Sequence, residues 1–380
     1  MVKILLDCRR QPIDFWETED GLFFGACRSL ADAIFPTITW LEPSISGQGV
    51  ARGWRFPYRD PWLRRFAGLF GRPSGIEPFI QRENPSLSIT IGDPPEPGTS
   101  IPTISWLAGS FDQELLSGRL ISTRKEWKSL ARCSGILVGS VSAEQFLIDR
   151  LPRLKGRIRM LAPFPANLHR PLDPVQKQLV RERYAEGRDY FLASLDGAEV
   201  ADLVALLLAF AVFKKRQRSN MALILINVPR SILEDFAEKK DSYRHREDLK
   251  WLTVHAPVDR SELLASAYTL LLPSSGGNPL LTLAAFSGRV PVISASVPRQ
   301  DSFWEASVLH SNLRDPEDLA GQMIALYKDE SIRTKLINRG DEERKRCNPE
   351  QSCSQFLELI GEVLRLPAEM TIHGKFAGKT

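Results

Sequence analysis

The chain has 380 residues, 25% of them charged, and a formal net charge of +4 at pH 7. This length predicts two domains, each large enough to have a core of its own. So weakly basic a balance gives no support to nucleic acid as a ligand. The five cysteines are scattered and form no CxxC pair, which argues against a disulfide framework and a zinc site.

The N-terminus, MVKILLDCRR, has an apolar run that is too short for a signal peptide and predicts a β-strand over Val2–Asp7. No apolar run reaches the roughly 20 residues that cross a bilayer. We therefore expect a cytoplasmic protein, and leave open a peripheral contact with a membrane.

The first half of the chain has short apolar runs separated by long segments rich in proline and glycine. Such runs are typical of buried parallel strands. The predicted elements that follow the first strand are a helix over Gly25–Ile34, strands over Leu87–Ile91 and Ile101–Leu107, a mostly helical stretch over Gln113–Cys133, a strand over Gly135–Gly139, a helix over Ser142–Arg150 and a strand over Arg157–Leu161. The proline-rich segment PFPANLHRPLD comes next and predicts a boundary near residue 168, between domains over 1–168 and 169–348.

The second half alternates more regularly between helical and strand patterns, and this alternation predicts a parallel sheet covered on both faces. Strands are predicted over Asp189–Ser194, Met221–Ile226, Trp251–Val254, Thr269–Leu272 and Val290–Ser294. Helices are predicted over Pro174–Glu186, Ala201–Lys215, Ile232–Lys240, Ser261–Ala267, Leu280–Phe286, Asp315–Tyr327, Ser331–Arg346 and Pro349–Leu364. The tail over 367–380 is polar and is expected to fray.

The stretch PSSGGNPLLTLAAFSGRVPVISAS, Pro273–Ser296, predicts a strand end, a glycine turn, a helix, a second turn and a strand. Asn and Pro suit the cap and the first turn of a helix, and a helix N-terminus after such a turn can hold a phosphate. An ordinary tight turn remains the alternative. The candidate binding residues here are Ser274, Ser275, Gly276, Gly277, Asn278 and Leu280.

This stretch resembles the C-terminal signature of family 4 glycosyltransferases, PSxxEGFGLPxLEAMAxGxPVI. Further segments resemble the same family in the same order along the chain. They are SGILVGSVSAEQFLIDRL with GRIRMLAPFPANLHRPL, DYFLASLDGAEVADLVALLLAF, VHAPVDRSELLASAYTLLLPS, and FWEASVLHSNLRDPEDLAGQMIALYKDESIRTKLINRG. The agreement in order and spacing covers roughly the last two thirds of the chain.

The resemblance implies an α/β protein of the GT-B fold, with two Rossmann-like domains whose parallel sheets face each other across a cleft. It also implies that a C-terminal helix over 349–366 packs back on the first domain. Such enzymes transfer a sugar from a UDP- or GDP-linked donor to a glycan, lipid-linked or other acceptor in polysaccharide or glycoconjugate biosynthesis. They typically need neither a metal nor a cofactor, because protein cations and helix N-termini hold the leaving diphosphate.

Four positions depart from the family pattern. An ungapped alignment at YFL places Asp196 and Ala201 where the family has the Arg and Lys that hold the diphosphate. Anchoring the signature on Pro291 places Gly276 and Ala284 at its two glutamates. Losing two charge-assisted hydrogen bonds would weaken diphosphate binding by roughly 3–6 kcal/mol. An inactive relative that serves as a binding or scaffold subunit, paired with an active glycosyltransferase, is therefore the alternative to a transferase.

Other residues could replace the missing family groups. Arg299 follows the strand over Val290–Ser294 and Arg289 precedes it, and each could supply a cation, although surface arginines are usually solvated. His255 follows the strand over Trp251–Val254, near where the family's nucleobase stacks, although a lone histidine is more often structural. The family's His-Asp pair falls on Ser105 and Trp106, so no catalytic residue is assigned.

Two segments of the first half are candidates for contact with an acceptor or a membrane. DGLFFGACRSLADAI resembles the family's glycine-rich acceptor loop, with Asp20 and Gly21 as candidates. The segment over 52–72 mixes arginines with Trp and Phe, which suits an interfacial helix on a membrane. An ordinary amphipathic helix packed on the first domain is the more common outcome for such a pattern.

Overall fold

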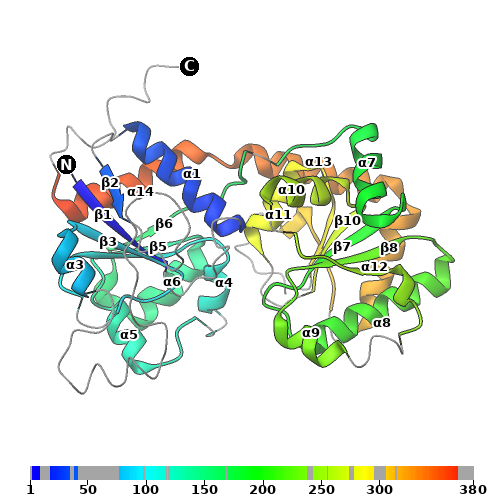
Figure 1. Ribbon diagram of the computed structural model, residues 1–380, viewed down its shortest axis with the longest axis horizontal. Coiled ribbons are helices and arrows are strands. Elements are labelled where there is room, and N and C mark those ends of the chain that lie inside the picture. Colours follow the sequence, from blue (N-terminus) through cyan, green and yellow to red (C-terminus); the bar gives the residue numbers. More distant parts are fainter. Residues whose placement is uncertain are drawn as a thin grey trace. The chain divides into compact units, whose positions relative to one another are not determined.

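The computed structural model describes residues 2–8, 18–34, 38–41, 77–96, 99–116, 118, 120–167, 169–237, 243–254, 256–273, 278–294, 305–312 and 315–366. Contacts between Cα atoms divide the chain into two compact units (Figure 1). Unit 1 comprises Met1–Trp16, Phe24–Pro163 and Pro349–Thr380. Unit 2 comprises Glu17–Phe23 and Phe164–Asn348. The predicted domains over 1–168 and 169–348 remain a prediction about independently folding parts.

Unit 1 contains a parallel six-stranded sheet. Its order is β2 (Ile38–Leu41), β1 (Val2–Asp7), β3 (Leu87–Ile91), β4 (Thr103–Leu107), β5 (Gly135–Val138) and β6 (Ile158–Met160). Strands β3, β4 and β5 are buried along their whole length, as expected of runs covered on both faces. The strand order changes direction between β1 and β3, as in flavodoxin-like sheets.

The helices of unit 1 are α3 (Glu77–Glu83), α4 (Phe111–Leu116), α5 (Arg124–Leu130), α6 (Val141–Arg150) and α14 (Pro349–Leu364). Helix α1 (Glu19–Ile34) belongs to unit 1 from Phe24 onward, and its first residues, up to Phe23, belong to unit 2. The C-terminal helix α14 lies against β5 and β6, far from it in sequence (Figure 1). Ser352 Oγ donates to the carbonyl of Ala162 at 2.8 Å, and Arg159 Nη2 lies 2.9 Å from Glu362 Oε2. These contacts fix α14 on the unit that begins the chain.

Unit 2 contains a second parallel sheet. Its order is β12 (Leu309–His310), β11 (Val292–Ser294), β10 (Thr269–Leu272), β7 (Tyr190–Ser194), β8 (Ala222–Ile226) and β9 (Leu249–Trp251). Because β7 comes first in the chain and β8 and β10 flank it, the topological switch point lies between β7 and β10. Ligands of open α/β sheets bind at the carboxyl ends of the strands at this point.

The helices of unit 2 are α7 (Pro174–Ala185), α8 (Val200–Gln217), α9 (Arg230–Ala237), α10 (Pro257–Ser266), α11 (Pro279–Ser287), α12 (Pro316–Lys328) and α13 (Glu330–Arg346). They cover both faces of the sheet, and alternate residues of each strand enter different cores. Phe191 packs with residues of α8 and α12, whereas Leu192 packs with residues of α10 and α11. Within the described residues, no helix combines the length and the apolar character required to cross a membrane.

Several predicted elements differ from the observed ones. The predicted helix over Gly25–Ile34 begins earlier, at Glu19, where two acidic residues occupy the first turn. The stretch over Gln113–Cys133 is two helices, because Thr123 and Glu126 form a capping box that starts α5 anew. Strand β9 lies at Leu249–Trp251 instead of Trp251–Val254. Strand β2 and helix α3 were not predicted, since both are short and lie among proline-rich segments.

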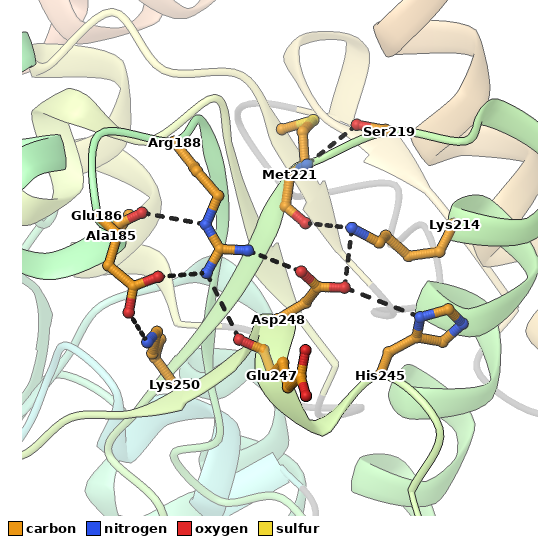
Figure 2. A network of polar contacts seen from close by, with 10 residues as sticks. All are labelled: Ala185, Glu186, Arg188, Lys214, Ser219, Met221, His245, Glu247, Asp248 and Lys250. Atoms are coloured by element: carbon orange, nitrogen blue, oxygen red, sulfur yellow. Dashed lines mark hydrogen bonds and ion pairs between the residues drawn. The ribbon is translucent and has the colours of Figure 1, made fainter.

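A polar network closes the amino-terminal edge of the unit 2 sheet (Figure 2). Asp248 accepts from Arg188 Nη1 at 2.7 Å and lies 2.9 Å from Lys214 Nζ. Lys214, which is 9% exposed, also donates to the carbonyl of Met221 at 3.1 Å. Met221 precedes β8 and Asp248 precedes β9, so the network joins α8 to the starts of both strands. Its charges are paired with one another, which indicates a structural role.

Candidate functional site

The candidate site lies at the carboxyl edge of the unit 2 sheet, at the switch point between β7 and β10. The chain leaves β7 through Leu195 and Asp196, and turns at Gly197, whose φ is 64°. The chain leaves β10 at Pro273 and re-enters described structure at Asn278, immediately before α11. The register between β7 and β10 therefore brings these two exits to the same edge.

Asn278 is the N-cap of α11. Its Oδ1 accepts a hydrogen bond from the backbone N–H of Leu281 at 2.9 Å, and Pro279 occupies the first helical position. Its carbonyl accepts from the hydroxyl of Thr282 at 2.8 Å, and its side chain is buried. The cap predicted from the sequence is therefore present, and it fixes the start of a helix whose positive end can attract an anion.

Asp196 lies against this cap. Asn278 Nδ2 donates to Asp196 Oδ2 at 3.3 Å, so one side chain caps α11 and contacts the loop after β7. Asp196 is itself exposed to solvent. The structure thus places a carboxylate of the protein beside the helix N-terminus, where a diphosphate would otherwise be attracted.

The two alanines at the family's charged positions have different surroundings. Ala201 is exposed in the first turn of α8 and offers no charge. Ala284 is fully buried in the core beneath α11 and is not exposed to solvent. If the signature is anchored on Pro279, which opens the helix, the second glutamate falls on Thr282, one turn into α11. The helix start is the better anchor because it sets which face of the helix each residue occupies.

The structure describes only some of the other candidates. Leu280 is buried in α11, one residue after Pro279. The residues Ser274, Ser275, Gly276, Gly277, His255 and Arg299, and the segment over 52–72, lie outside the described residues. Their proposed roles remain predictions.

Asp20 and Gly21 lie in the first turn of α1 and not in a loop, so the predicted acceptor loop is helical here. Arg289 precedes β11 and lies at the amino edge of the sheet, opposite Asn278, which makes it unsuitable as a substitute cation of this site. The sequence could not show this, because the edge that a residue reaches depends on where the strand begins.

Arg260 is a functional candidate that the sequence alone did not identify. It lies in the first turn of α10, which leaves the carboxyl end of β9 and runs beside α11 (Figure 1). The Cβ of an alanine at Gly288 would lie 3.2 Å from the Cα of Ala265, which shows how closely the two helices approach. The Nε and Nη2 atoms of Arg260 are buried and have no hydrogen-bond partner. A partly exposed arginine with two unpaired guanidinium donors is a candidate for binding an anionic ligand.

A buried histidine was also missed. His169 Nε2 lies 2.8 Å from Glu19 Oε2, and only 1% of the His169 side chain is exposed. This contact ties the first turn of α1 to the segment before α7, and both residues belong to unit 2. No local sequence pattern predicts this pair, because the two residues are 150 positions apart.

The described residues of the other candidate positions have structural roles. Trp106 is fully buried in the core of unit 1, in edge-to-face contact with Phe24 and Phe356. Ser105 donates to the carbonyl of Asp93 at 3.0 Å. In the part of the chain that the structure describes, no group of His, Cys, Asp and Glu is arranged to hold a metal ion.

No family model and no curated protein matches the sequence. Solved structures match nearly the whole chain. WaaG, a glycosyltransferase involved in lipopolysaccharide biosynthesis, superposes with a TM-score of 0.68 at 14% identity, over 93% of this chain and 99% of that chain. The chain has the GT-B fold. The fold class predicted from the sequence is therefore confirmed.

Two further GT-B structures contain a nucleotide. HepE from Anabaena, in complex with UDP and glucose, matches with a TM-score of 0.63 at 13% identity, over 95% of this chain and 100% of that chain. MnaA from S. aureus, in complex with UDP, matches with a TM-score of 0.62 at 13% identity, over 97% of this chain and 98% of that chain. At such identities the GT-B likeness carries the fold, and the chemistry has to be argued from the residues.

Proposed function

We propose that the chain is a glycosyltransferase-like protein that binds a nucleoside diphosphate sugar at the carboxyl edge of the unit 2 sheet. The observation that carries the proposal is the meeting of the capped start of α11 with the β7 loop at the switch point. This is where open α/β sheets bind ligands, and a helix N-terminus suits the diphosphate. That the matched HepE and MnaA structures hold UDP supports UDP as the first nucleotide to test.

In the reaction, a hydroxyl oxygen of a glycan, lipid-linked or other acceptor attacks the anomeric carbon of the donor sugar. The bond from that carbon to the diphosphate oxygen breaks, the nucleoside diphosphate leaves, and the acceptor hydroxyl loses its proton. The leaving group gains negative charge, so catalysis requires donors placed around it. Arg260 and the backbone N–H of Leu280 are the described groups that can supply them, because Pro279 has no N–H and the N–H of Leu281 donates to the cap.

The test is binding of UDP, measured by calorimetry, to the wild type and to Arg260→Gln. We expect the variant to bind at least tenfold more weakly, because a hydrogen bond to a charged group is worth about 1.5–3 kcal/mol. Arg230→Gln is the matched control, since Arg230 is 91% exposed and, among the described residues, pairs only with Glu234 on the same helix. Equal affinity of all three proteins would remove Arg260 from the site.

The position of Asp196 favours a second function, a binding or scaffold subunit without turnover. Its carboxylate stands beside the α11 cap, and Ala201 provides no compensating cation. Release of UDP or GDP from their common sugar derivatives distinguishes the two functions. Steady release above the buffer rate supports the transferase, whereas a folded protein that binds UDP and releases none supports the scaffold.

A further inference from the structure

The amino edge of the unit 2 sheet, opposite the candidate site, gathers positive charge. Three neighbouring strands begin there side by side. Tyr268 N donates to the carbonyl of Tyr190, and Leu270 N donates to the carbonyl of Pro291, both at 2.9 Å. The residues at the starts of the three strands therefore lie along this edge. Asp189 and Tyr268 immediately precede β7 and β10, and Arg289 lies three residues before the start of β11.

Two arginines from the surrounding helices converge on this edge. Arg181 of α7 places Nη2 2.7 Å from Asp189 Oδ1. Arg333 of α13 stacks over the ring of Tyr268 at 5.0 Å and places Nη1 3.1 Å from Glu330 Oε1. The Nε atoms of both arginines are buried and have no hydrogen-bond partner. Each guanidinium therefore has one N–H donor without a hydrogen-bond partner.

Two more cations complete the cluster. Lys177 precedes Arg181 by one turn of α7 and is half-buried, and its ammonium makes no hydrogen bond or ion pair with any described residue. Burial lowers the pKa of Lys177, and repulsion from Arg333, Arg181 and Arg289 lowers it further, against the attraction of Asp189. We call Lys177, Arg181, Arg289 and Arg333 the edge cation cluster. These four cations are accompanied by two carboxylates, those of Asp189 and Glu330.

In the polar network of Figure 2, at the same edge, the cations are paired with carboxylates. There Arg188 and Lys214 share Asp248, and Lys250 pairs with Glu186. The edge cation cluster differs because Lys177 lacks such a partner and two buried guanidinium N–H groups are open. Lys177, Arg181 and Arg333 are half-buried, and half-buried cations that repel one another are costly unless an anion joins them.

We propose that the edge cation cluster binds a small phosphate-bearing ligand. Phosphate has several acceptor oxygens, and Arg guanidinium groups bind it through parallel N–H donors. A lipid headgroup carries the same chemistry, but the helix geometry favours a soluble ligand. The exposed apolar residues of α7, Val175 at 70% and Leu179 at 58%, are each two positions from a cluster cation. Two positions turn a helix by about 200°, so this apolar face points away from the cations.

The experiment is calorimetric titration of the whole protein with inorganic phosphate, at constant ionic strength set by NaCl. The variants are Lys177→Gln and Arg289→Gln, which leave the contacts of Arg181 and Arg333 intact. We expect the wild type to bind phosphate and each variant to bind it about tenfold more weakly. Lys215→Gln, on an exposed part of α8, is the control and is expected to keep wild-type affinity.

A second readout is the melting temperature, measured without and with phosphate. Because the cluster cations repel one another, Lys177→Gln is expected to melt no lower than the wild type without phosphate, and to gain less from added phosphate. Absence of phosphate binding by the wild type, or a loss of phosphate affinity in Lys215→Gln equal to that in Lys177→Gln, would overturn the proposed site. Binding to phosphatidic acid vesicles without binding of free phosphate would overturn the soluble ligand.

Discussion

The side-chain amide of Asn278 lies 3.3 Å from the carboxylate of Asp196 and joins the first turn of α11 to the loop after β7. The same asparagine caps the helix through its Oδ1, so its two polar atoms have separate tasks. As a result, the orientation of Asp196 is coupled to the integrity of the cap. A negative charge at this place interacts favourably with the helix N-terminus and competes with any ligand phosphate for it.

The close packing of α13 on α11 gives a direct test of the fold of unit 2. A Cβ at Gly340 would lie 2.6 Å from a ring carbon of Phe286, whereas a Cβ at Gly321 would meet nothing within 4 Å. We expect Gly340→Ala to lower the free energy of unfolding by about 1–3 kcal/mol. Gly321→Ala, also within a helix, is expected to raise it by up to about 1 kcal/mol. Denaturant titration of the two variants measures these changes. A Gly340→Ala variant as stable as the wild type would contradict the close packing of α13 on α11.

A buried carboxyl in unit 1 predicts a pH dependence of stability. Asp112, 3% exposed in α4, accepts from the N–H of Gly139 at 2.8 Å, and burial raises its pKa from 3.8 to about 7. Because the folded pKa lies above the unfolded one, its contribution is complete below pH 3.8 and is lost as the pH rises through about 7.

Asp112→Asn keeps an acceptor for Gly139 and removes the charge. Relative to the wild type, it should become more stable on going from pH 4 to pH 8, by up to about 4 kcal/mol at 1.36 kcal/mol per pKa unit. Asp149→Asn, at an exposed position of α6, is the control and should show no such trend. Parallel pH profiles of wild type and Asp112→Asn in denaturant titrations would refute the raised pKa.

Asp248 holds two cations of the network in Figure 2, and its removal should be costly. Asp248→Ala removes the carboxylate partner of the buried Lys214 and leaves Arg188 with Glu186 alone, and we expect a loss of about 3 kcal/mol in unfolding free energy. Glu234→Ala breaks only an exposed pair within α9 and should change stability by less than about 0.5 kcal/mol. UDP affinity should be equal in both variants, since the network lies at the opposite edge from Asn278.

The reactivity of the thiols tests the burial of α14 against α1. Cys27 and Cys353 are buried with their Sγ atoms 3.4 Å apart, and burial raises the pKa of Cys27. Burial also raises the pKa of Cys133 to about 12. Of the five cysteines, only Cys8 and Cys347 are partly exposed. A disulfide reagent should therefore modify at most two thiols in the native protein and five after unfolding, whereas five rapid reactions in the native state would contradict the packing.

The sequence predicted most of the second sheet because its strands are short, uninterrupted apolar runs between helical patterns. It also predicted the cap at Asn278, since the order Asn-Pro before an apolar run starts a helix. It could not place Arg260 and Arg289 at opposite edges, because that depends on the direction in which the chain crosses the sheet. The signature anchored on Pro291 aligned Ala284 with a family glutamate, and the sequence alone could not show that this residue is buried in the core under α11.

The most direct test of the account is the affinity for UDP after the charge at Asp196 is changed. Asp196→Asn retains an acceptor for Asn278 and should bind UDP severalfold more tightly than the wild type, because repulsion of the diphosphate is removed. Asp196→Arg with Ala201→Lys should bind more than tenfold more tightly, with a gain that shrinks as salt rises. Glu234→Gln serves as the control for removal of a carboxylate elsewhere in unit 2. Unchanged or weaker UDP binding by Asp196→Asn, in a protein with a normal unfolding transition, would contradict the claim that the charge of Asp196 weakens diphosphate binding.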